Sequence, residues 1–588
     1  MIKKFSTVVL KKGITRKVAI SVLPVLVIIL GTLPAVSAII KPGYFAMHDD
    51  LQAMRQLEMD KCFRDLQIPC RWVPDMGYGY GYPLFNYYPP MPYYLGEIFH
   101  LVGFSFLDTV KVLFVLVFVS SAFSMYLLTR EFWGRIGGTV SALFYVWAPY
   151  HAVDVYVRGA MNEAWALVWF PAILWAIYKV IKTNKWLYVS FLAFFVSMLA
   201  LSHNPLLMVF APGAVIWVIF WFWQTRSLKS FTKLFVAGVW SIALAAFFTL
   251  PVIFEQKFAH IETLTIGYFG YQAHFVDLRQ LFIDVNWGYG ASYSYIDQKD
   301  TMSFHLGYLH WVLSIFSLIV AWFLRKKKFQ FSLLIIFFFF WTYGYTFLTH
   351  LRSSLIWEII VPLKYLQFPW RLLSLSMIGM SFLAGSFFAL PFVKTKFSRL
   401  GLALALIVMV IFLNRNYFTW REFYPKMTDQ EKFSGKLWEL QRTSGIFDYL
   451  PIWAPMPPAN PAPSDAEVLS GKGQHTTLKK VSNFQEYQVS VESDSTEFQI
   501  NTLYFPGWEA SVDSKKVLLD PARDRELGRM IVDLEKGNHQ IVVKLKNTPI
   551  RTLGNYLSLI GWILLVGFFS LRFFRKFAPF KIFSDKNV

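Results

Sequence analysis

Long apolar runs separated by short polar segments dominate the chain. The hydrocarbon core of a bilayer is about 30 Å thick and needs roughly 20 mostly apolar residues per helix. Because a backbone in lipid must satisfy its own hydrogen bonds, such runs are expected to be helices. The pattern predicts a polytopic α-helical membrane protein with about twelve transmembrane helices. The runs lie near residues 18–40, 108–129, 136–150, 163–181, 186–202, 205–223, 234–253, 304–324, 329–348, 370–390, 399–413 and 552–571.

A different pattern precedes the last run, where apolar and polar residues alternate with a period of two. Short alternating stretches separated by turn residues, such as Asp494-Ser495 and Lys536-Gly537-Asn538, are typical of a small β-sandwich. The alternating stretches are Tyr487–Glu492, Glu497–Tyr504, Trp508–Val512, Met530–Leu534 and His539–Leu545. We therefore divide the chain into a multi-helix membrane domain (1–413) with a first outer loop (41–107), a Pro-rich outer linker (414–463), a β-sandwich-like domain (464–550), and a last helix with a basic tail (551–588).

The distribution of charge predicts how these helices are oriented across the membrane. The formal net charge is +20, yet only 16% of the residues are charged, against roughly 25% in soluble domains. The positive charge lies in short connections, and cytoplasmic loops carry an excess of Lys and Arg. Both termini are therefore predicted to be cytoplasmic and the long connections extracytoplasmic, so that the charge needs no nucleic-acid partner. The basic inner segments are Thr129–Arg135, Lys179–Lys185, Gln224–Lys233, Arg325–Lys328, Lys394–Arg399 and Arg572–Lys586.

Three features of the N-terminal part each allow two interpretations. The run at 18–40 ends in Ala35-Val36-Ser37-Ala38, as a cleaved signal peptide would, but it exceeds the roughly 7–15 residues of a signal-peptide core, which favours a retained helix. Cys62 and Cys70 lie in one outer loop and form either a disulfide or a pair of free thiols. The aromatic, glycine-rich stretch from Tyr78 to Pro90 suits sugars or lipid tails, or forms an interfacial aromatic belt.

Acidic residues follow the first apolar run directly, in His48-Asp49-Asp50. Two adjacent carboxylates at a membrane surface repel each other and lose hydration, and both effects raise the pKa of at least one of them. Such a group can act as a general base toward a hydroxyl or bind a divalent cation. The simpler alternative is that the pair caps the helix expected at Leu51–Asp65.

A second polar group stands at the membrane edge between the third and fourth runs, where Asp154, Arg158 and Glu163 share one short connection. An arginine there can bind a phosphate through two parallel hydrogen bonds, whereas helix capping explains Glu163 alone. His203 and Arg371 are further candidates, because ionisable groups at membrane depth usually mark a function. The alternatives are that His203 only turns a corner and that Arg371 only snorkels.

These residues carry a resemblance to known families. The first helix, the acidic His48-Asp49-Asp50 and the long outer loop resemble the GT-C superfamily of membrane glycosyltransferases. The segments MHDD, YGYPLFNYYPP and RGAMNEAWAL are similar to bacterial membrane proteins labelled 6-pyruvoyl-tetrahydropterin synthase-related. The segments YFPGWEASVDSKKV and LEKGNHQIVVKLK, with the last helix, resemble the end of YfhO-like membrane proteins. The resemblance implies a bacterial plasma-membrane enzyme with an extracytoplasmic active face and a catalytic carboxylate at Asp49 or Asp50; some members require a divalent cation such as Mg or Mn.

The predicted function is transfer of a sugar, with inversion, from a polyprenyl-phosphate donor to a glycan or other acceptor of the cell envelope. Asp50 or Asp49 would be the catalytic base, and any metal would bind this pair. Two alternatives are a transporter or flippase of lipids or lipid-linked sugars, which would need ionisable residues near the bilayer midplane, and a non-catalytic scaffold for envelope assembly. The residues expected to bind substrate are His48, Asp154, Arg158, Glu163, His203 and Arg371, with Arg158 at the leaving phosphate.

Overall fold

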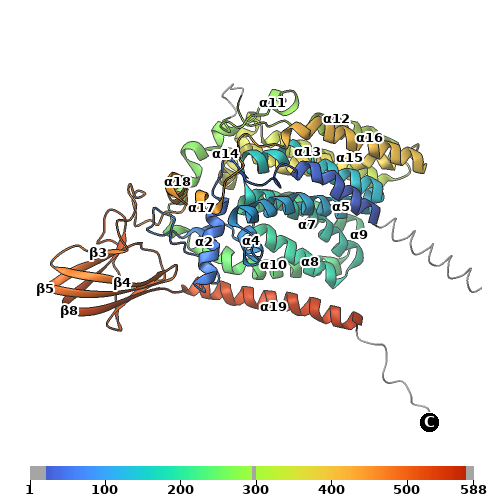
Figure 1. Ribbon diagram of the computed structural model, residues 1–588. Helices are drawn as coiled ribbons and strands as arrows, with labels where there is room; N and C mark the ends of the chain where they lie inside the picture. The colour runs from blue at the N-terminus through green and yellow to red at the C-terminus, as the bar shows by residue number, and fades with distance from the viewer. Residues whose placement is uncertain (1–21, 294–299, 446, 578–588) are drawn as a thin grey trace, which may run out of the picture.

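The structure is a computed structural model that describes residues 22–293, 300–445 and 447–577. It is mostly helical, and a β-sheet projects from one end of the helix bundle (Figure 1). The basic segment before residue 22 and most of the tail Arg572–Lys586 lie outside the described residues. The placement of both termini in the cytoplasm rests on those segments and stays a prediction.

Eight helices in the described part have the length and hydropathy of a membrane span, so the chain is an integral membrane protein. The longest of them is interrupted at Gly134 (φ 72°, ψ −176°) and contains two of the predicted runs. Three shorter apolar helices, Val22–Val36, α8 (Trp186–Ala200) and α12 (Tyr308–Leu324), coincide with further runs. Each predicted run thus contains a helix where it is described, but the number of twelve spans is not confirmed. The eight spans are α5 (Phe106–Val146), α7 (Met161–Thr183), α9 (Asn204–Thr225), α10 (Leu228–Phe254), α13 (Phe329–Leu348), α15 (Leu373–Ala384) with its flanking turns, α16 (Lys396–Asn414) with the turn after it, and α19 (Pro549–Phe577).

The last helix, α19, runs along the side of the bundle and packs against α10 (Figure 1). A Cβ atom on Gly554 would come within 2.6 Å of the carbonyl oxygen of Ala246, so the two backbones approach closely. The Ser558 hydroxyl donates to the carbonyl of Ala243 at 2.9 Å. Small residues and serine hydroxyls are the usual means of helix association in lipid, where apolar burial between helices contributes little.

The domain before α19 is one six-stranded antiparallel sheet with the strand order β3-β5-β8-β6-β7, in which β4 also pairs with β5. The rings of Tyr487 and Phe498, eleven positions apart on β5, lie 5.6 Å from each other, so β5 bends sharply between them and the sheet folds over on itself. The β-sandwich-like description stays a prediction. The expected turns at Asp494-Ser495 and Lys536-Gly537-Asn538 lie at this bend, where a register shift between Val491 and Ser495 interrupts the pairing of β5 with β8. The strands are β3 (Ala466–Val468), β4 (Gly473–Val481), β5 (Phe484–Leu503), β6 (Trp508–Val512), β7 (Lys515–Val517) and β8 (Arg529–Leu545).

The segment expected to be a linker, 414–463, is folded over the first outer loop. Its strand β2 (Phe423–Tyr424) pairs antiparallel with β1 (Tyr44–Phe45), and Asp429 accepts hydrogen bonds from the backbone N–H groups at the start of α5. Short helices of the loop and of this segment lie between the sheet and the bundle (Figure 1). These helices are α2 (Gln52–Arg64), α4 (Met91–Leu101), α17 (Asp429–Lys432) and α18 (Gly435–Thr443).

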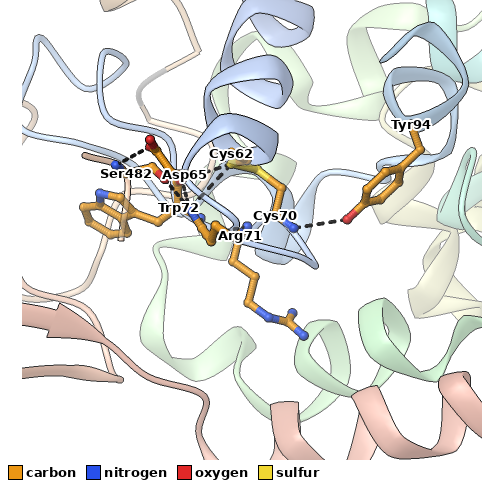
Figure 2. Close-up of a disulfide and its surroundings, with 8 residues drawn as sticks. Cys62, Asp65, Cys70, Arg71, Trp72, Tyr94 and Ser482 are labelled. Atoms are coloured by element: carbon orange, nitrogen blue, oxygen red, sulfur yellow. Dashed lines mark hydrogen bonds between the residues drawn. A yellow bond between two sulfur atoms is a disulfide. The ribbon is translucent and has the colours of Figure 1, made fainter. Parts of the chain in front are cut away.

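Cys62 and Cys70 form a disulfide in the first outer loop, which is one of the two alternatives that the sequence left open (Figure 2). The turn that the disulfide closes contacts the sheet domain, where the backbone N–H of Ser482 donates to Asp65 Oδ2 at 2.7 Å. The disulfide therefore supports the contact between the first outer loop and the sheet.

A buried polar junction lies beyond the disulfide. Arg71 points away from the sulfur atoms toward α10 and α19 (Figure 2), and its Nη2 donates to Asn555 Oδ1 of α19 at 2.9 Å. Glu255, at the end of α10, accepts from Asn86 of the first outer loop at 3.0 Å and from Arg551 of α19 at 2.9 Å. The first outer loop, α10 and the last helix are thus joined by buried charged groups, which are costly to separate.

Candidate functional site

A cavity of about 400 Å³ lies where the first outer loop, the starts of α7 and α9, the residues before α15 and the segment after α18 meet. This volume falls within the range of roughly 300–1,000 Å³ that is typical of small-molecule sites. Helices whose starts are far apart in the sequence thus direct polar side chains into one space. Six of the eight predicted site residues line it, namely His48, Asp49, Arg158, Glu163, His203 and Arg371; Asp50 and Asp154 do not.

Asp49 is held from three sides at the cavity wall. Its backbone N–H donates to the carbonyl of Arg158 at 2.8 Å, and its Oδ2 accepts from Arg55 Nη1 at 2.8 Å and from Gln52 Nε2 at 2.9 Å. Within the described residues no hydrogen bond engages Oδ1, and 35% of the side chain is exposed. Helix α2 begins after Leu51 without a side-chain cap, so the helix-capping alternative is not realised. One oxygen of Asp49 is oriented by a cation while the other is available to a ligand.

Asp50 does not line the cavity, contrary to the prediction that either aspartate could act there. Its Oδ2 accepts from Lys432 Nζ of α17 at 2.6 Å. Burial raises the pKa of Asp50, and the Lys432 ammonium opposes the shift. Asp50 is therefore a structural ion-pair partner that fixes the segment after α16 to the first outer loop.

The two aspartates also do not fit the divalent-cation site predicted for them. The Arg55 guanidinium and the Lys432 ammonium occupy the positions at Asp49 Oδ2 and Asp50 Oδ2 that a cation would take. In the part of the chain that the structure describes, no three or more His, Cys, Asp or Glu side chains gather as a metal site would require. We derive no step through a metal at this pair.

Two arginines share one buried glutamate on the cavity wall. Glu163, in the first turn of α7, accepts at Oε2 from Arg158 Nη1 at 2.6 Å and from Arg371 Nε at 3.1 Å, and at Oε1 from the Tyr150 hydroxyl at 2.5 Å. Arg371 also donates to Gln367 Oε1 at 3.0 Å. Among the described residues no hydrogen bond engages the Nη2 group of either arginine, so both guanidiniums keep donors for a ligand.

Asp154 is the second partner of Arg158, at 2.6 Å, but it is fully buried behind the cavity wall. Burial, reinforced by the nearby Glu163 carboxylate, raises the pKa of Asp154 well above its ordinary value. Because Asp154 lies behind the wall, the two guanidiniums and not its carboxylate contact the space of the cavity. The cluster favours an anionic ligand such as a phosphate.

Both predicted histidines on the wall are tied to the backbone. His203 Nδ1 accepts from the N–H of Leu206 and so caps α9, as the corner interpretation requires, yet the ring also lines the cavity. Burial and the nearby Arg371 lower the pKa of His203 to about 3. His203 is thus neutral, with its proton on Nε2.

His48 is held by a different backbone contact. Its Nε2 atom lies 2.6 Å from the carbonyl oxygen of Tyr289 and therefore donates the hydrogen bond, and burial lowers the pKa of His48. His203 thus has its Nδ1 lone pair engaged by the backbone, whereas His48 is held through Nε2.

Sequence reasoning missed Asp448 and Tyr449, which line the same cavity from the segment taken as a linker. Burial raises the pKa of Asp448 to about 6, with Arg55 opposing the shift and Asp49 adding to it. No motif surrounds Asp448; the available signal is a single acid inside an aromatic stretch between Phe447 and Leu450. Tyr88, at the end of the aromatic stretch of the first outer loop, also lines the cavity, and its ring lies 4.3 Å from the Arg55 guanidinium.

The fold and the site together define an integral membrane protein with a cavity that is lined by an oriented carboxylate and by two guanidiniums. No protein-family model matches the sequence. A protein of Lactococcus lactis subsp. cremoris, described as uncharacterized, is 21% identical over 212 residues, which are 34% of this chain and 34% of that protein. The chain thus matches about a third of the length of this relative, whose activity has no description.

Two solved glycosyltransferase structures align with part of this chain. Arabinofuranosyltransferase AftD from Mycobacteria aligns with a TM-score of 0.44 and 12% identity, over 69% of this chain and 27% of that one. The oligosaccharyltransferase AglB of Archaeoglobus fulgidus, in complex with an inhibitory peptide and a dolichol-phosphate, aligns with a TM-score of 0.40 and 12% identity, over 69% and 57%. TM-scores below 0.5 carry no argument about activity, and the 6-pyruvoyl-tetrahydropterin synthase-related and YfhO-like labels stay predictions. The function is therefore argued from the residues of the cavity.

Proposed function

We propose that this protein is a membrane glycosyltransferase that moves a sugar from a polyprenyl-phosphate donor to an acceptor of the cell envelope, on the extracytoplasmic face of the plasma membrane. The observation that carries the proposal is that Asp49 lines the same cavity as the guanidiniums of Arg158 and Arg371. A base for a hydroxyl and donors for a departing phosphate are the two requirements of this reaction.

In the proposed step, Asp49 accepts the proton of the acceptor hydroxyl while that oxygen forms a bond to the anomeric carbon. The bond from this carbon to the phosphate oxygen breaks, and its electron pair leaves with the polyprenyl phosphate. Arg158 and Arg371 bind the phosphate as its charge grows. Attack from the side opposite the leaving group inverts the configuration. General-base assistance of this kind contributes about 10²–10⁴-fold.

Two features support a lipid-linked donor on the outer face. The cavity lies at the N-terminal ends of α7 and α9, whereas basic residues such as Lys182 and Arg226 lie at their C-terminal ends, as cytoplasmic ends require. Tyr365, which lines the cavity, is 46% exposed, and Ile266 (59%) and Val361 (55%), which lie within four positions of the lining residues Leu264 and Tyr365, are also exposed. Such a surface suits the tail of a polyprenyl lipid.

The test is donor consumption by the full-length protein in proteoliposomes. Radiolabelled polyprenyl-phosphate sugars are supplied with a cell-envelope extract as the acceptor, and wild type is compared with Asp49→Asn and Asp50→Asn. We expect Asp49→Asn to lose about 10²–10⁴-fold in rate and Asp50→Asn, whose residue lies outside the cavity, to stay within about tenfold of wild type. Glu439→Gln, on the outer segment and away from the cavity, is the matched control. Wild-type rates in Asp49→Asn would remove the assigned base.

The same vesicles separate transfer from transport. A glycosyltransferase releases polyprenyl phosphate, whereas a flippase moves the intact labelled lipid between leaflets. Movement without cleavage of the sugar–phosphate bond would replace the proposal by the transport alternative.

A further inference from the structure

Asp448 presents a carboxylate to the cavity that is not engaged by the protein. Within the described residues, no hydrogen bond or ion pair engages either of its oxygens, and the residue is half-buried at the cavity wall. By contrast, Asp49 is bonded to Arg55 and Gln52, and all the oxygens of Glu163 are occupied. A half-buried carboxylate without a protein partner keeps both oxygens for water or for a ligand in the cavity, and a hydroxyl group of a ligand can replace that water.

The backbone around Asp448 is fixed by the aromatic stretch of the first outer loop. The Tyr82 hydroxyl donates to the carbonyl of Gly445 at 2.8 Å and accepts from the N–H of Tyr449 at 2.8 Å, so it bridges both ends of the turn that carries Asp448. The ring of Tyr449 stacks on Tyr87, with 5.5 Å between centroids and 22° between planes. The acid is therefore held by buried contacts, which is the requirement for a binding group of defined geometry.

The chemistry around Asp448 suits a polyol with apolar faces. A carboxylate accepts hydrogen bonds from hydroxyl groups, and aromatic rings pack against the C–H faces of a sugar. Tyr88 and Tyr449 supply such rings on the same wall. Arg158 and Arg371 can bind the anionic end of a ligand, so the cavity offers separate contacts for a phosphate and for hydroxyl groups.

We propose that Asp448 binds a hydroxyl group of the transferred sugar and thereby selects which sugar is accepted. This inference rests on the proposed glycosyltransferase function and deepens it, because it assigns sugar recognition to the outer segment before the sheet domain and phosphate recognition to the helix ends.

The test measures binding to the full-length protein in nanodiscs. The probes are farnesyl phosphate, which lacks a sugar, and a panel of farnesyl-phosphate hexoses and pentoses. Wild type is expected to bind at least one glycosyl form more tightly than farnesyl phosphate. Asp448→Asn is expected to lose about tenfold or more of affinity for that form, since a hydrogen bond to a charged group is lost, and to bind farnesyl phosphate as wild type does. Asp448→Glu, longer by one methylene, is expected to change the order of preference among the sugars.

The outcomes distinguish the proposed glycosyltransferase function from the proposed role of Asp448. If wild type binds neither farnesyl phosphate nor any glycosyl form, the proposed function fails. If it binds farnesyl phosphate but no glycosyl form more tightly, or if Asp448→Asn and Asp448→Glu keep the wild-type preference, the role of Asp448 is overturned while the phosphate site stands. Unchanged binding of farnesyl phosphate also shows that the variants are folded. If Asp448→Asn does not fold, the sugar preference of Asp448→Glu decides alone.

Discussion

Replacing Glu163 tests whether the cavity wall is a buried charge network. Glu163 is 1% exposed and accepts from Arg158, Arg371 and Tyr150 at 2.6, 3.1 and 2.5 Å. Removing one partner from a buried ion pair costs about 3–5 kcal/mol, because an uncompensated charge is left behind. Arg158 keeps Asp154 and Arg371 keeps Gln367. We therefore expect about 3 kcal/mol for Glu163→Gln, which retains acceptor and donor atoms, and about 5 kcal/mol for Glu163→Ala.

The assay is unfolding in detergent micelles, followed by tryptophan fluorescence. Tyr150→Phe, which removes one hydrogen bond to Glu163 but no charge, is the matched control and should cost about 1–3 kcal/mol. Folded Glu163→Gln should also bind farnesyl phosphate at least as tightly as wild type, since its arginines are less neutralised, whereas Arg371→Gln should bind it more weakly. Wild-type stability in Glu163→Ala would refute the charge network. Loss of farnesyl phosphate binding in Glu163→Gln, with normal binding in Arg371→Gln, would refute the anion site.

Three further predictions concern the outer segments. Burial raises the pKa of Asp448 to about 6 from its ordinary 3.8, so the folded state binds this proton more tightly than the unfolded state does. The free energy of unfolding therefore has its full value below about pH 4, falls as the pH rises, and is lower by up to about 3 kcal/mol above pH 6. Asp448→Asn should thus melt above wild type at about pH 7.5 but not at about pH 4; equal melting at the higher pH contradicts this. Lys432→Met and Asp50→Asn should couple by about 1–3 kcal/mol in a double-mutant cycle of unfolding free energies, and additive effects would disprove the ion pair. Joint replacement of Cys62 and Cys70 by serine should cost about 2–3 kcal/mol, and reductant should lower the wild-type melting temperature to that of the variant; a variant that melts like oxidised wild type argues against the bond.

The membrane part follows from the sequence because lipid leaves a backbone few choices. Apolar runs must be helical, and the one interruption inside a long helix, at Gly134, falls between two predicted runs. Strand extents are less predictable, since the turn residues Asp494-Ser495 lie at a register shift where β5 bends within the sheet, and so mark a bend and not the end of a strand.

The site was predictable only in part. Hydropathy alone brings Asp49, Glu163 and His203 to one side of the membrane, and they meet at one cavity. The choice between Asp49 and Asp50 depends on Lys432, which is 382 residues away from Asp50. Asp448 depends on Tyr82, which bonds to its neighbour Tyr449 across 367 positions. Contacts at such separations leave no periodic trace in a single sequence.

The dispersal of these contacts along the chain has a consequence for biosynthesis. Asp49 leaves the ribosome early, but the groups that fix its loop, including Lys432, Ser482 and Asn555, are translated hundreds of residues later. Part of the support of this loop is therefore added only after most of the helices have been translated, although Gln52, Arg55 and Arg158 contact Asp49 from early on. A polypeptide stopped before α19 would contain every residue that lines the cavity but would lack the contacts of Asn555 with Arg71 and of Arg551 with Glu255, which fasten the first outer loop and α10 to the last helix.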